Sequence, residues 1–269
     1  MLGSSRESLS ACRDGLDARR QDAAFSGLAG ELFAVADLLD RENQLRSALA
    51  DSGQLSAVSE SLVRDVLGGK VSDLALDVVL LAVGQRWSQD VDLVMALEQL
   101  ADQASFTVAE AQGALDSTEE ELFLFGRALD SSPALQMALT DPAQSAATKA
   151  AIVRDLIGGR STAATLDVLQ YAVGHLHGRR IDAVVDELCA LAASQRERVV
   201  AEVRVAAPLE DAQSARLAAL LTRLKGRTVR LNVAVDPSVL GGVHVTIGDE
   251  VIDGTVASRM EQARRAVLG

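Results

Sequence analysis

Apolar residues recur at helical spacing through roughly the first two hundred positions of the chain. Separations of three and four residues are typical of one face of an amphipathic helix. The clearest stripe of this kind lies near the end of the region, at Ile181, Val184, Val185, Leu188, Leu191 and Ala192. The pattern therefore predicts a helical region that ends near residue 198.

Short polar and glycine-containing segments divide this region into helices. Asp141-Pro142 interrupts the apolar spacing, and Gly158-Gly159 follows a helix that should end at Ile157. Glycine commonly ends a helix because it adopts positive φ at little cost. Thr162 is expected to begin the next helix as its N-cap. Capping-box spacings predict two further helix starts, at Ser4 with Glu7 and at Ser117 with Glu120 or Thr118 with Glu121.

The helical region contains an internal duplication. A shift of ninety positions aligns the chain with itself without a gap, so that Glu-Leu-Phe at 31–33 recurs at 121–123 and Val-Arg-Asp at 63–65 recurs at 153–155. Between residues 31 and 84, 22 of 54 aligned positions are identical. Chance would give roughly 4 or 5 in so biased a composition. Two copies of one helical unit follow from this.

The period changes from helical to alternating after Arg198. Residues 199–205, 229–235 and 243–247 alternate as strands do, and Val251-Ile252 offers a short returning strand. Four apolar residues should place an intervening helix on the sheet: Leu217, Leu220, Leu221 and Leu224. The fold class is therefore mainly α, with a duplicated helical bundle region followed by a small α+β domain. We expect helical copies at 1–105 and 106–198, and the α+β domain at 199–269.

Composition and charge narrow the possible functions. The net charge of −12 disfavours binding to nucleic acid, which needs a positive surface. The longest apolar run, at residues 78–83, is far shorter than the ~20 residues that span a bilayer. The charged first twenty residues do not resemble a signal peptide. Cys12 and Cys189 fit no metal-ligand spacing, so we expect two reduced thiols in a cytoplasmic protein. Because no apolar run is long enough, we expect no direct insertion into the membrane.

The sequence has no recognisable motif for catalysis, cofactor binding or metal binding. The Gly-Gly pairs at 68–69 and 158–159 follow no strand and precede no Gly-Lys-Ser/Thr, which favours helix caps over a phosphate loop. On a helix the side chains of His175 and His177 would point about 160° apart, so we do not expect them to bind one metal ion together. The acidic residues at 249–253 lack the spacing of a calcium loop. We therefore expect no catalytic residue, cofactor or metal.

The C-terminal residues carry a resemblance to a known family. The chain ends with a series of features in a fixed order: two glycines, an alternating strand, a Gly-Asp turn, Val-Ile-Asp-Gly and a basic helix. This order resembles that of the ATP synthase delta subunit family, whose mitochondrial member is the oligomycin-sensitivity-conferring protein. The residues of this structural motif are Gly241, Gly242, Gly248, Asp249, Ile252, Asp253 and Gly254. The chain resembles an enlarged, actinobacterial-type member, since familiar short members lack a second helical copy.

The resemblance implies a function and partners. It implies a non-catalytic subunit of the peripheral stalk, or stator, which links the catalytic head to the membrane-anchored b stalk so that rotor torque drives ATP synthesis. The helical region would bind the N-termini of the alpha subunits, and the C-terminal domain would bind the C-terminal helix of subunit b. The complex would hold the protein at the cytoplasmic side of the cell membrane. Which helical copy binds alpha stays open.

Two groups of residues are candidate partner contacts. The apolar stripe of Ile181, Val184, Val185 and Leu188 could form a wall of a helix-binding groove, or it could serve as internal core. The basic cluster of Arg259, Arg264 and Arg265 could contact an acidic partner, or it could be a solvated helix face.

Two other classes of protein are alternatives to a stator subunit. A free-standing helical adaptor would use the duplication to bind partner helices outside any ATP synthase. A small-molecule enzyme would use the α+β domain and would need a pocket with convergent polar groups.

The turn at Gly254 gives a testable prediction. We expect Gly254→Val to disrupt the C-terminal domain, because valine does not adopt the positive φ expected there, while the helical region stays folded. Thermal melting followed by circular dichroism would measure this. A variant that melts like the parent and still binds subunit b would contradict our interpretation of the Val-Ile-Asp-Gly segment.

Overall fold

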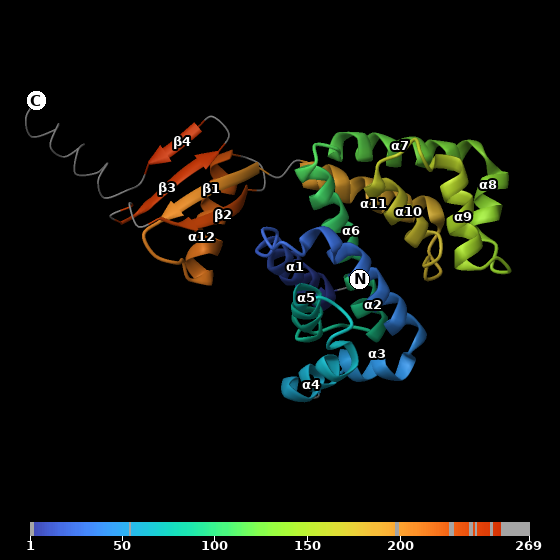
Figure 1. The fold of residues 1–269 in the computed structure, drawn as a ribbon, viewed down its shortest axis with the longest axis horizontal. Helices are drawn as coiled ribbons and strands as arrows, with labels where there is room; N and C mark the ends of the chain where they lie inside the picture. Colours follow the sequence, from blue (N-terminus) through green and yellow to red (C-terminus); the bar gives the residue numbers. More distant parts are fainter. Residues whose placement is uncertain are drawn as a thin grey trace, which may run out of the picture. The chain divides into compact units, whose positions relative to one another are not determined.

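A computed structural model describes residues 3–53, 55–196, 199–225, 229–236, 239, 241–247 and 250–253 of the 269-residue chain. Within these residues there are twelve helices and four strands (Figure 1). The chain divides into two compact units, Met1–Gln195 and Arg196–Gly269. The mainly helical fold with a small α+β C-terminal part is confirmed.

The first unit is built from helices alone within its described residues. In chain order they are α1 (Gly3–Asp17), α2 (Phe25–Arg41), α3 (Asn43–Ala50), α4 (Ser56–Leu67), α5 (Asp73–Val83), α6 (Asp90–Ala111), α7 (Leu115–Ser131), α8 (Pro133–Thr140), α9 (Ala146–Ile157), α10 (Ala163–Ala172) and α11 (Ile181–Arg196). The bounds of α2, α3 and α4 recur at α7, α8 and α9 with the offset of ninety that the sequence shows.

Helix α6 belongs to both copies of the repeat. It is the last helix of the first copy. It also holds the position that α1 has in the first copy, because the offset of ninety places residues 3–17 at residues 93–107, inside α6. The helix continues without a break past residue 105, and one hydrophobic core contains buried side chains of both copies. Leu93, Leu97, Leu100 and Phe106 of α6 are completely buried in it. The two copies therefore form a single unit.

The same side-chain clamp closes both copies. Glu31 of α2 accepts hydrogen bonds from the backbone N–H and hydroxyl of Ser72, at 3.0 and 2.5 Å. Glu121 of α7 accepts the corresponding bonds from Thr162, at 2.9 and 3.2 Å, and a third from the Thr165 hydroxyl at 2.6 Å. Ser72 and Thr162 are also the N-caps of α5 and α10. Each clamp thus ties the start of one helix to another helix of its copy.

Helix ends agree with the sequence at the glycine pairs but not at the capping boxes. Gly69 and Gly159 have φ of +70° and +81°, as expected for caps after α4 and α9. The predictions for Ser4, Ser117 and Thr118 were wrong, because these residues lie inside their helices, which begin at Gly3 and Leu115. The N-cap of α7, Ala114, makes no side-chain cap.

The second unit is a four-stranded sheet with one described helix. The elements are β1 (Val199–Val205), α12 (Asp211–Lys225), β2 (Val229–Val235), β3 (Val243–Ile247) and β4 (Glu250–Asp253). The strand order is β2-β1-β3-β4, in which β2 is parallel to β1 while β3 and β4 are antiparallel to their neighbours. Alternate strand residues such as Val203 and Val245 are buried, as predicted.

The apolar face of α12 is narrower than the sequence predicts. Leu221 is buried and Leu217 packs against the core, but Leu220 and Leu224 are 64% and 61% exposed. On a helix these two leucines are rotated by about 100° and 60° from Leu221, so they lie beyond the face that covers the sheet.

None of the helices in the described residues is both long enough and apolar enough to cross a bilayer.

The repeated clamp predicts a specific loss of stability. We expect Glu121→Ala to lower the free energy of unfolding by about 1–3 kcal/mol, because the donors of Thr162 and Thr165 lose their acceptor. Urea unfolding followed by circular dichroism would measure this. The control is Glu120→Ala, at an exposed neighbouring position of the same helix, which should change stability by less than about 0.5 kcal/mol. Equal losses in the two variants would show that the clamp contributes nothing.

Candidate functional site

The described part of the C-terminal motif forms a β-hairpin and the turn before it. Gly241 and Gly242 precede β3 with φ of +142° and +83°, a conformation that favours glycine. In the hairpin Ile252 pairs with Val245 and packs against the sheet core, and Asp253 pairs with His244. Six predicted residues lie outside the described part of the chain: Gly248, Asp249, Gly254, Arg259, Arg264 and Arg265.

The predicted apolar stripe lies on α11 and points into the helical unit. Ile181, Val184, Val185 and Leu188 are all at most 5% exposed. Val185 reaches Gly126 of α7, and Val184 and Leu188 also line a pocket next to α6. The stripe thus packs within the unit, and contact with a partner stays a prediction.

The most elaborate cluster of polar residues lies where the two helical copies meet, and sequence reasoning did not predict it. Its aromatic part is a stack of three rings. The ring of Phe33, from α2, lies 4.1 Å from that of Tyr171, from α10, and Tyr171 lies 4.0 Å from His175. We call this cluster, together with Asp37, Asp40, Glu98, His177 and Arg179, the copy junction.

Hydrogen bonds at the copy junction converge on Glu98. His177 Nε2 lies 2.7 Å from Glu98 Oε1, and the Tyr171 hydroxyl donates to the same oxygen at 3.2 Å. His175 Nε2 lies 3.3 Å from an Asp37 oxygen. The Glu98 hydrogen bond raises the pKa of His177, and the nearby Asp40 adds to the effect. His177 is thereby favoured in its charged form.

Charge is segregated across the copy junction. The carboxylates of Asp37 and Asp40 come from α2 of the first copy and that of Glu98 from the shared helix α6, whereas the second copy supplies the histidines and Arg179. His177 has φ of +49°, an unusual conformation for a residue with a side chain, which requires support from its surroundings. Its contact with Glu98 provides such support. The two copies are therefore joined by complementary charge as well as by the shared core.

The two histidines meet because they do not lie on a helix. On a helix they would point about 160° apart, but α10 ends at Ala172 and both histidines lie in the connection that follows it. Their rings lie 6.3 Å apart. Gly174 and Gly178 mark this turn in the sequence and were the available signal. Among the described residues, no three His, Cys, Asp or Glu side chains are grouped to hold a metal ion.

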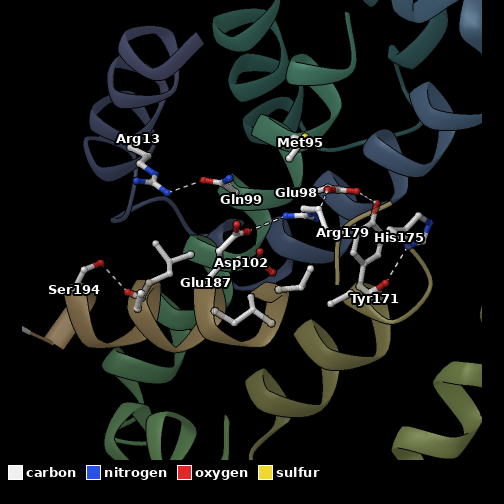
Figure 2. A pocket seen from close by; sticks show the side chains of 15 residues that line it. Arg13, Met95, Glu98, Gln99, Asp102, Tyr171, His175, Arg179, Glu187 and Ser194 are labelled. Atoms are coloured by element: carbon white, nitrogen blue, oxygen red, sulfur yellow. Dashed lines mark hydrogen bonds and ion pairs between the residues drawn. The ribbon is translucent and has the colours of Figure 1, made fainter. Parts of the chain in front are cut away.

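A pocket of about 290 Å³ lies beside the copy junction, between α6 and α11 (Figure 2). Its lining includes Glu98, Asp102, Arg179 and Glu187. Burial, reinforced by the charge of Glu98, raises the pKa of Asp102 well above its ordinary value. The charged groups bind one another, as Arg179 does with Glu187 at 2.8 Å. Arg179 also lies 4.0 Å from Glu98, so one arginine contacts carboxylates of α6 and α11.

Known proteins resemble the chain over its whole length. The family model for the ATP synthase delta (OSCP) subunit matches residues 102–267. The chain is 45% identical to ATP synthase subunit delta of Streptomyces avermitilis, over 98% of this chain and 97% of that protein. The corresponding proteins of Streptomyces griseus and Parafrankia sp. are 44% and 43% identical, with at least 99% of both chains covered in each case.

The chain belongs to the ATP synthase delta (OSCP) subunit family.

Membership of the delta family decides between the classes of function that the sequence left open. The chain is a non-catalytic subunit of the ATP synthase peripheral stalk, and neither the free-standing adaptor nor the small-molecule enzyme is favoured. The match to the family model begins at residue 102, inside α6, which is the helix that the two copies share. The first copy lies largely outside that model, but the full-length delta relatives cover it. The copy junction thus fastens this additional copy to the part that matches the family model.

The copy junction predicts a dependence of stability on pH. The pKa of His177 is raised above its ordinary value of about 6.5, so its stabilising contribution is complete below about pH 6.5 and is lost as pH rises through the raised value. His177→Gln keeps a hydrogen-bond donor but cannot take up a proton. We expect it to flatten this part of the curve of unfolding free energy against pH, measured by urea unfolding.

Two further variants complete this experiment. Asp102 contributes a dependence of the same sign that begins at lower pH, because its pKa is also raised, and Asp102→Asn separates that effect. His244→Gln, on β3 of the other unit, is the control for loss of a histidine outside the copy junction. If His177→Gln gave a curve parallel to that of the wild type above pH 6.5, the charged contact would not stabilise the unit.

Proposed function

We propose that the helical unit binds the N-terminal segments of the alpha subunits and that the C-terminal unit binds the C-terminal helix of subunit b. In this arrangement the delta subunit links the catalytic head to the b stalk at the cytoplasmic side of the cell membrane. The link holds the head against the torque of the rotor, so that rotation drives ATP synthesis.

The observation that carries this proposal is the division of the chain into two units with separate hydrophobic cores. A link between two partners needs two surfaces that can be occupied at once, and separate compact units provide them. The delta relatives match nearly the whole length of the chain, so the match includes both units. The division therefore favours one partner for each unit.

Exposed apolar residues on the C-terminal unit favour docking of a partner helix. A helix that lies in a groove is held by apolar residues at spacings of three and four, while charged residues at the rim set its position. On the C-terminal unit Leu220 and Leu224 of α12 are exposed one helical turn apart. We assign them to the contact with subunit b, together with the predicted cluster of Arg259, Arg264 and Arg265.

On the helical unit the predicted contact is the stripe of α11. Val184 and Leu188 line the pocket beside α6, so they are the members of the stripe that an alpha segment could reach through that pocket. Ile181 and Val185 would support them from the core.

A binding experiment on the full chain tests the proposal. Isothermal titration calorimetry with an N-terminal alpha peptide and with a C-terminal fragment of b should show one binding event for each, and sedimentation should show a ternary complex. Leu220→Ser with Leu224→Ser should weaken b binding by about tenfold or more and leave alpha binding unchanged.

Two results would overturn the proposal. If neither probe bound, the delta subunit would contact other parts of the complex. If the two probes competed for one site, the assignment of one partner to each unit would be wrong.

A further inference from the structure

We propose that Glu110 is a positioning residue that holds the last turn of α11, where the chain leaves the helical unit, and so keeps the connection to the C-terminal unit short. Glu110 lies in the last turn of α6, and the same oxygen of its carboxylate contacts residues of two other segments. The value of a short connection rests on the proposed function, because a link under torque should not lengthen.

One contact of Glu110 is with the end of α11. Gln195 is the last residue of the helical unit and is only 1% exposed. Its side-chain Nε2 donates to Glu110 Oε2 at 2.7 Å and to Thr107 Oγ1 at 3.3 Å. Both acceptors belong to α6. A buried amide without partners would be destabilising, so these bonds favour the state in which the end of α11 lies against α6.

The other contact of Glu110 is with the segment that follows α1. Arg20 lies in a turn after α1, and its Nη2 lies 3.6 Å from Glu110 Oε2. The two side chains are 18% and 25% exposed, so water and salt screen this pair less than a pair on the open surface. At the end of α1, Asp17 accepts a hydrogen bond from Gln103 of α6 at 2.9 Å. The ends of α1, α6 and α11 are thereby joined in one polar network.

Comparison of the two copies indicates why the end of α11 needs such support. The offset of ninety places Ala111, the end of α6, at position 201, whereas α11 ends at Arg196 and β1 begins at Val199. The counterpart of Gln195 is Ser105, which lies inside the continuous α6. In α6 the following turn donates hydrogen bonds to the carbonyl groups of this region, but the last carbonyl groups of α11 have no such donors. The side-chain bonds of Gln195 supply support that helix continuation supplies in the first copy.

Fraying of this end would change the length of the connection. A residue adds 1.5 Å of length in a helix and about 3.3 Å in an extended chain. Unwinding of one turn of about four residues would therefore lengthen the connection by up to about 7 Å. A longer connection would have to be extended before a load passed along the chain. Glu110 counteracts this by holding Gln195 against α6.

Hydrogen exchange followed by mass spectrometry tests the role of Glu110 in the full-length chain. In Glu110→Ala we expect the amides of residues 192–195 to exchange about tenfold faster or more, while those of α7, α8 and α9 exchange as in the wild type. Glu110→Gln keeps an acceptor for Gln195 and should restore most of the protection. The control is Glu120→Ala, the same substitution at an exposed position of α7, which should not change exchange in α11.

A second substitution tests whether Glu110 acts through Gln195. Gln195→Ala should accelerate exchange in the last turn of α11 to a similar extent. The double variant Glu110→Ala with Gln195→Ala should then differ little from Gln195→Ala alone, because both changes remove the same hydrogen bond. Wild-type exchange in Glu110→Ala, or fully additive effects in the double variant, would overturn the inference.

A distance measurement tests the consequence for the connection. Spin labels are placed by unnatural amino acids at Asp155 of α9 and Ala212 of α12, which are both exposed, and double electron–electron resonance gives the distribution of distances. We expect the upper limit of this distribution to rise by up to about 7 Å in Glu110→Ala and not in Glu120→Ala. Faster exchange with an unchanged distribution would show that the last turn does not set the length of the connection, and the inference would fail.

These measurements distinguish the inference from the proposed function. Neither of them contains an alpha or b segment, so their results do not depend on partner binding. Failure of the proposed function would appear in the titrations with those partners, whereas failure of the inference would appear in the exchange and distance measurements.

Discussion

The helical unit depends on the burial of most of one central helix. Helix α6 is enclosed by elements of both copies, so its polar residues require partners within the protein. Asp92 accepts a hydrogen bond from Ser5, and Gln103 donates one to Asp17, both in α1. The partners of Glu98 come from the second copy. The polar residues of α6 therefore fix the positions of its neighbours, because each would be destabilising if it were unpaired.

The duplication produced two copies with unequal surroundings. Phe33 of the first copy is buried against Tyr171, whereas its counterpart Phe123 in the second copy is exposed. The copy junction also uses residues that differ between the copies, since Asp37 corresponds to Arg127 and His177 to Trp87. Residues that maintain the bundle, such as Glu31 and Glu121, are the same in both copies. The fold was thus retained while the outer surfaces acquired different roles.

The sequence predicts the regular elements well and the contacts between them poorly. Residues such as Thr162 and Gly159 act within a few positions of themselves, so their roles as caps could be predicted locally. The shared role of α6 was hidden because residues 3–17 and 93–107 have almost no identity. The contact of His177 with Glu98 joins residues 79 positions apart, and no local pattern indicates such a pair. Of the C-terminal motif, the described turn and hairpin lie in the predicted strand order.

An uninterrupted α6 has a mechanical consequence for a protein that must withstand torque. Its 22 residues form a rod about 33 Å long whose backbone hydrogen bonds run through both copies. A flexible linker at this place would allow the two copies to move relative to each other, and part of the energy of each rotary step would be stored in the bending of the linker. A continuous helix has low compliance, so a load applied to one copy is passed to the other with little elastic loss.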